Sequence, residues 1–275
     1  MKKLLLLLIL TGLASATTNV VVSILPLKTF VKKIGGERVN TTVMVEAGAS
    51  PHNYEPKPSQ MREITQAKIY FSIGVEFERV WLEKFKNQNR ELILSDVIKD
   101  INRTIEIVEQ NEKELDPHIW VDPIQVKKMA HNIYSTLSQV DSNNSQYYKK
   151  NLEKFLDEID NLDKKIKEIL SKTPKNSTFM VFHPAWGYFA QRYNLEQVSV
   201  EVEGKAPKMR ALIQLIKRAK KEKIRAIFTQ PEFSDKSAKI IADNLKISVI
   251  KTSPLAEDWS ENLLKLARAI AERVE

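Results

Sequence analysis

The sequence contains no cysteine among its 275 residues. Disulfide bonds are therefore excluded, and so is a bacterial lipid anchor, which needs a cysteine at the signal junction. Met1–Lys3 gives a basic start, Leu4–Leu10 is apolar, and Thr11–Ala16 ends in a small-x-small pattern. This order is typical of a secretory signal, and we predict cleavage after Ala16. We expect an exported protein without a lipid anchor, in a periplasm or released outside the cell.

Long apolar runs are also missing beyond this leader, so the mature chain is expected to be soluble. Several enzyme motifs are absent as well. There is no His-Glu-x-x-His motif, no Gly-x-Ser-x-Gly motif and no Gly-Lys-[Ser/Thr] phosphate loop. We therefore do not expect an enzyme.

Positive charge is only moderately in excess, with a formal net charge of +8, and 43% of the residues are hydrophobic. Lysine and glutamate are interleaved along predicted helices, as in Lys164–Glu168, which is typical of a solvated face with ion pairs. We expect no nucleic-acid partner. The length suffices for two domains of ordinary size.

Short apolar stretches rich in β-branched residues alternate with helical patterns in both halves of the chain. Predicted strands are Val20–Leu25, Val39–Val45, Ala67–Ile73, Glu91–Leu94, Thr178–Phe182, Gln197–Val202, Ile224–Thr229 and Ile247–Ile250. Predicted helices lie near Pro26–Ile34, Ser59–Gln66, Glu78–Lys86, Ile124–Leu137, Ala185–Tyr193, Pro207–Lys221, Ser234–Leu245 and Glu257–Val274. Such alternation indicates parallel sheets that are covered on both faces.

One long helix is expected between the two halves. Its apolar residues alternate spacings of four and three: Tyr148, Leu152, Phe155, Ile159, Leu162, Ile166 and Ile169. A helix of this length is better suited to link two domains than to lie within one. We predict an α/β protein with two parallel-sheet (β/α)4 domains, at 17–140 and 174–275, joined by a linking helix at 141–173 after a signal at 1–16.

Three of the four histidines adjoin a proline: His52, His118 and His183. Proline restricts its neighbours and so favours rigid loops that hold an imidazole in place. Ligands collect beyond the carboxyl ends of parallel strands, so all three rings could reach a cleft between the domains. Three neutral imidazoles suit zinc or another borderline divalent ion. His131 lies in a helical pattern and is not expected to be a ligand.

Three segments of the sequence resemble the ligand motifs of the cluster A-I metal receptors, the substrate-binding proteins of zinc and manganese ABC importers. They are Ser50–Ser59, Asp116–Pro123 and His183–Phe189. The resemblance implies capture of a divalent metal in the periplasm and docking on a membrane permease powered by an ATPase. Manganese receptors of this family tend to carry glutamate where this chain has His183, so histidine there favours zinc. We expect the receptor to act as a monomer.

Two departures from this family concern the metal. The His-rich loop of many zinc receptors is replaced by Glu106–Leu115, which is short, acidic and without histidine. The family's frequent fourth ligand, an aspartate, aligns with Ser253. We therefore expect water as the fourth ligand, since Glu257 and Asp258 suit the start of the last helix.

Other functions stay open from the sequence alone. A receptor for manganese or iron would share these motifs. A secreted zinc hydrolase would combine three histidines with a general base, for which Asp122, Glu201 and Glu232 are available. An adhesin has no sequence feature in its favour.

Overall fold

The computed structural model describes residues 17–104, 106–109, 112–201 and 205–272. The predicted signal at 1–16 lies outside these residues. Within them, no helix is both long enough and apolar enough to cross a membrane.

The first domain is built on a parallel sheet with the strand order β2-β1-β3-β4. Its strands are β1 (Thr18–Ile24), β2 (Val39–Val45), β3 (Ile69–Ser72) and β4 (Ile93–Asp96), and its helices are α1 (Leu25–Gly35), α2 (Pro58–Gln66) and α3 (Glu78–Gln88). The central strands β1 and β3 are almost wholly buried, as expected for a parallel sheet covered on both faces. Short 3-10 turns η1 (Gly36–Arg38) and η2 (Pro51–Asn53) lie on either side of β2.

The second domain repeats this plan with the strand order β10-β9-β7-β8. Its strands are β7 (Ser177–Val181), β8 (Leu195–Ser199), β9 (Ala226–Thr229) and β10 (Ser248–Lys251), and its helices are α6 (Gly187–Arg192), α7 (Met209–Lys221), α8 (Lys236–Leu245) and α9 (Trp259–Ala271). All of the pairings in this sheet are parallel. The predicted α/β class, with two four-stranded parallel sheets, is thereby confirmed.

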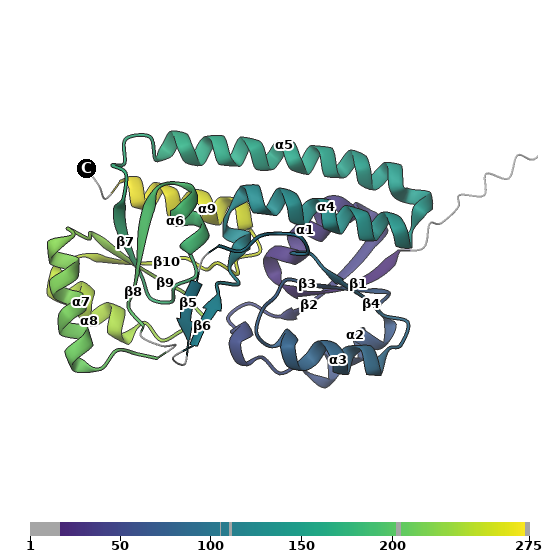
Figure 1. Ribbon diagram of the computed structural model, residues 1–275, viewed down its shortest axis with the longest axis horizontal. Helices are drawn as coiled ribbons and strands as arrows, with labels where there is room; N and C mark the ends of the chain where they lie inside the picture. The colour runs from purple at the N-terminus through teal and green to yellow at the C-terminus, as the bar shows by residue number, and fades with distance from the viewer. Residues whose placement is uncertain (1–16, 105, 110–111, 202–204, 273–275) are drawn as a thin grey trace, which may run out of the picture.

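The predicted long helix joins the two domains. It is α5 (Ser145–Ile169), which follows α4 (Pro123–Val140) and the short turn η4 (Ser142–Asn144). It runs along both domains (Figure 1) and packs against α1 and α4 toward one end and against α9 toward the other. Its buried residues are Tyr148, Leu152, Phe155, Ile159, Leu162, Asp163 and Ile166. The apolar stripe in the sequence is therefore the buried face of the helix.

An antiparallel hairpin between the domains was not predicted. It consists of β5 (Glu106–Glu109) and β6 (Glu112–Leu115), paired from Glu106 with Leu115 to Glu109 with Glu112. Its sequence is rich in glutamate, which disfavours strands, so only the pairing of the two strands reveals it. The hairpin leads directly into the loop that carries His118 and the turn η3 (Ile119–Val121).

Four predicted helices begin two residues later than expected, and those predicted from Pro207 and Ser234 begin at Met209 and Lys236. The helix predicted from Ala185 begins at Gly187, and the helix predicted from Glu257 begins at Trp259. In the last case the Asp258 side chain accepts a hydrogen bond from the backbone N–H of Glu261 at 3.5 Å and so caps the helix. The residues before α6 and α9 remain in loops beside the cavity described next.

Candidate metal centre

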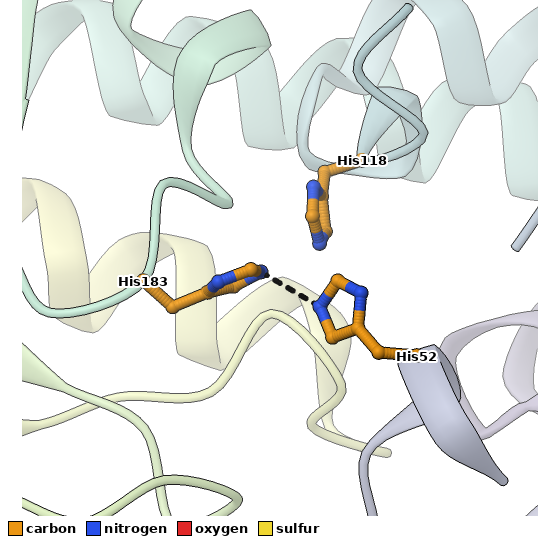
Figure 2. Close-up of side chains that lie close together, drawn as sticks. All are labelled: His52, His118 and His183. Carbon is orange, nitrogen blue, oxygen red and sulfur yellow. Dashed lines mark hydrogen bonds between the residues drawn. The ribbon is translucent and has the colours of Figure 1, made fainter. Parts of the chain in front are cut away.

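The three proline-flanked histidines converge from three different loops. His52 lies in η2 beyond β2, His118 lies just before η3, and His183 follows β7. Their rings point toward one another (Figure 2), and one nitrogen from each lies within 4.8 Å of the others. The Nε2 atoms of His52 and His183 are 3.1 Å apart. His131 is exposed on α4 and takes no part in this group.

Two of the imidazoles are fixed by buried carboxylates. The Nδ1 atom of His118 lies 2.7 Å from Asp116 Oδ1, and the Nδ1 atom of His183 lies 2.8 Å from Glu201 Oε1. Asp116 also accepts the backbone N–H of His118 at 2.8 Å. A carboxylate that takes the Nδ1 proton leaves Nε2 with its lone pair for a metal. Asp116 therefore orients the His118 ring.

The third imidazole has a longer contact with its carboxylate. The Nδ1 atom of His52 lies 3.3 Å from Glu76 Oε1, and both side chains are partly exposed, at 23% and 18%. Burial alone would raise the pKa of Glu76, but the hydrogen bond and charge of His52 lower it to about 2. Sequence reasoning missed Glu76, which carries no proline or histidine nearby. Its place just beyond β3 is the only signal for it.

The neutral form of His183 is favoured before any metal arrives. Burial lowers the pKa of His183, and the hydrogen bond that its Nδ1–H donates to Glu201 offsets this only in part. The Phe233 ring stacks on the imidazole with a centroid distance of 4.6 Å. A neutral, stacked imidazole with an oriented Nδ1 is suited to act as a metal ligand.

The cavity between the rings is small, at about 10 Å³. It is lined by Pro51, His52, His118, His183, Glu232, Phe233, Pro254 and Leu255. This volume holds about one water-sized sphere. It suits a single ion and has no room for an organic substrate.

The carboxylates considered as general bases have different positions. Asp122 lies at the start of α4, where it accepts the backbone N–H of Ile124 at 2.8 Å, and its Oδ1 is 3.4 Å from Arg192 Nε. Glu201 is engaged with His183. Glu232 alone among the three lines the cavity, and burial raises the pKa of its carboxyl.

Ser253 and the two acidic residues after it, Glu257 and Asp258, differ in their contacts and in their position relative to the cavity. The Ser253 hydroxyl donates to Glu232 Oε1 at 2.6 Å and accepts the backbone N–H of Leu255 at 3.0 Å. Glu257 forms an ion pair with Lys28 at 2.8 Å and is half exposed. Glu257 and Asp258 both lie outside the cavity lining.

The His118 loop is tied to the second domain by two indole hydrogen bonds. Trp120 Nε1 donates to the carbonyl of Pro254 at 2.8 Å, and Trp259 Nε1 donates to the carbonyl of Trp120 at 2.8 Å. All of these partners are buried or nearly so. His118, although contributed by the first half of the chain, is therefore held with His183.

Known proteins resemble this chain in fold and in sequence. A crystal structure of ZnuA is 39% identical with a TM-score of 0.88, and the match covers 94% of this chain and 100% of that chain. The manganese ABC transporter substrate-binding lipoprotein PsaA of Streptococcus mitis is 26% identical over 269 residues, covering 88% of this chain and 85% of the relative. The high-affinity zinc uptake system protein ZnuA of Bacillus subtilis is 26% identical over 255 residues, covering 85% and 78%.

These similarities, together with the two-sheet fold, place the chain among the metal-binding substrate receptors of ABC transporters. The family described as zinc-uptake complex component A, periplasmic, matches residues 20–274, and the chain belongs to this family. Members of the family are receptors of transporters, so the expectation that the protein is not an enzyme is confirmed.

Proposed function

We propose that the protein captures zinc with His52, His118 and His183 and delivers it to the permease and ATPase of an ABC importer. The convergence of three imidazoles on a cavity of single-ion size supports this proposal. Each imidazole has its Nδ1 atom next to a carboxylate, which turns Nε2 toward the cavity. Zinc binds as the transported substrate and not as a resident cofactor.

The choice of zinc over manganese rests on ligand chemistry. The PsaA relative named for manganese and the Bacillus subtilis ZnuA named for zinc are equally similar to this chain, at 26% identity. Imidazole nitrogen is a good ligand for zinc, whereas manganese prefers carboxylate and other oxygen ligands. His183, with its neutral ring, supplies an imidazole nitrogen at the position where manganese receptors of this family tend to carry glutamate.

Native mass spectrometry of the purified protein tests this proposal. We expect one zinc ion per chain, and zinc should displace manganese when both are offered at equal concentration. His118→Ala should lose the ion, whereas His131→Ala, which changes an exposed histidine on α4, should keep it. Retention of manganese in preference to zinc would contradict the assignment of the metal.

The cellular setting is also part of the proposal. We place the receptor in the periplasm, cleaved near Ala16, without a lipid anchor and as a monomer. We also keep the domain limits 17–140 and 174–275, with a linking segment at 141–173. Cell fractionation followed by intact-mass measurement and gel filtration checks the location, the cleavage site and the oligomeric state together.

A further inference from the structure

Besides the imidazoles, the residues that line the cavity include one side chain with an atom that can bind a metal ion. Of the other lining residues, Pro51, Phe233, Pro254 and Leu255 have apolar side chains, and only Glu232 has a side-chain oxygen. The backbone carbonyls of the two prolines are already engaged. Phe77 N donates to the Pro51 carbonyl at 3.2 Å, and Trp120 Nε1 donates to the Pro254 carbonyl at 2.8 Å.

The Glu232 carboxylate is only half used. Its Oε1 atom accepts the Ser253 hydroxyl at 2.6 Å, whereas its Oε2 atom is buried and has no hydrogen-bond partner among the described residues. A buried carboxylate oxygen without a partner weakens the fold and calls for a functional explanation. A cation in the adjoining cavity would satisfy it.

The segment that carries Glu232 is fixed to the turn of His183. The Gln230 side chain accepts the backbone N–H of His183 at 3.2 Å and donates to the His183 carbonyl at 3.0 Å. Phe233 stacks on the same imidazole. Glu232, between these two anchors, is therefore held beside the site by the end of β9.

We propose that Glu232 completes the zinc site as its fourth ligand, in place of water, and that Ser253 holds the carboxylate in the empty protein. This proposal rests on the proposed function of the three histidines. Zinc in a closed site takes four ligands, so three imidazoles leave one position, and Glu232 is the lining residue whose side chain can fill it. The carboxylate lies outside the 4.8 Å cluster of imidazole nitrogens, so it must rotate about its side-chain bonds to reach the ion.

Zinc affinity, measured by competition with a chromogenic chelator, gives the first test. Glu232→Gln keeps the shape and the hydrogen bond from Ser253 but is a poor ligand, and we expect at least about 100-fold weaker binding, as for the loss of one of four zinc ligands. The matched control Glu257→Gln changes a half-exposed glutamate outside the cavity and should bind within about threefold of the wild type. Equal affinity of Glu232→Gln and the wild type would overturn the proposal.

A second test uses the wild-type protein loaded with Co2+ and titrated with azide. A water ligand is displaced by azide and the visible spectrum changes, whereas a carboxylate ligand blocks the position. We expect no change for the wild type and a clear change for Glu232→Gln. A wild-type response to azide would assign water and overturn the role of Glu232 alone, whereas a wild type that binds neither zinc nor cobalt would overturn the proposed function as well.

Discussion

The two sides of the imidazole cavity are held with different firmness. His118 and His183 are 4% and 3% exposed, and each has a carboxylate within 2.8 Å of its Nδ1 atom. We call these two residues the clasped side, because Trp120 and Trp259 join the His118 loop to the second domain. His52 forms the open side, with a side chain that is 23% exposed and a carboxylate at 3.3 Å.

This difference indicates how an ion enters and leaves. A metal site binds tightly when its ligands are held in place before the ion arrives. The clasped side supplies two ligands that are already fixed, so the ion should meet these first. The open side supplies a ligand that can adjust, so His52 should be the last to bind and the first to release.

Removal of a ligand on the clasped side should give the largest effect. We expect His118→Ala or His183→Ala to weaken zinc binding by roughly 100- to 1000-fold, since zinc sites gain about 3–4 kcal/mol from each of four ligands. Isothermal titration with a competing chelator measures this loss. His118→Ala should also lower the melting temperature of the metal-free protein, because it leaves the fully buried Asp116 without its imidazole.

His52→Ala separates the two sides. It should weaken zinc binding to a similar extent, yet leave the melting temperature of the metal-free protein nearly unchanged, because Glu76 is partly exposed. Equal destabilisation by His52→Ala and His118→Ala would show that the two sides do not differ in the empty protein.

The orienting carboxylates should give a smaller effect, graded by side. Asp116→Asn removes the negative charge from the acceptor of a buried 2.7 Å bond, and we expect zinc affinity to fall about 10- to 100-fold. Glu76→Gln changes the longer, partly exposed contact and should cost less than about tenfold. The same titration compares the two variants, and a larger loss for Glu76→Gln would reverse the assignment of the sides.

The sequence predicted which imidazoles converge better than it predicted their surroundings. Prolines beside His52, His118 and His183 mark rigid loops within a few residues of each ring, so local patterns sufficed. The contact between Glu232 and Ser253 depends on β9 and β10 being neighbours in the sheet, which no local pattern encodes. A parallel sheet brings together strand ends that are far apart in the sequence. Because local sequence patterns do not give the strand order, they do not predict which residues contact the three histidines.

The indole clasp should give a moderate effect on stability. Trp120→Phe leaves the Pro254 carbonyl without its donor, and we expect the free energy of unfolding to fall by about 1–3 kcal/mol. Trp81→Phe is a matched control, because Trp81 is half-buried on α3 and outside the clasp. Urea unfolding followed by circular dichroism compares the variants. If Trp120→Phe were no less stable than Trp81→Phe, the clasp would contribute nothing to holding His118.

The linking helix is fixed to both domains, which limits motion between them. On one side Asn151 donates to the Ile34 carbonyl at 3.0 Å. On the other side Asp163 accepts two hydrogen bonds from Arg192 of α6, both at 2.8 Å. A continuous helix with a buried stripe resists bending far better than an extended linker.

The smallest expected effect is therefore the change in overall shape on loading. If only the His52 turn and the Glu232 side chain adjust, the radius of gyration should be nearly the same with and without zinc. Small-angle X-ray scattering of the metal-free and the zinc-loaded protein measures this directly. A marked compaction on loading would mean that the domains rotate about α5 and that the clasped side is not in its final position before the ion binds.

Arg192→Lys replaces the bidentate contact with Asp163 by a single charge, and it is the variant most suited to allow such motion. Compaction in Arg192→Lys but not in the wild type would locate the restraint at the junction of α5 and α6.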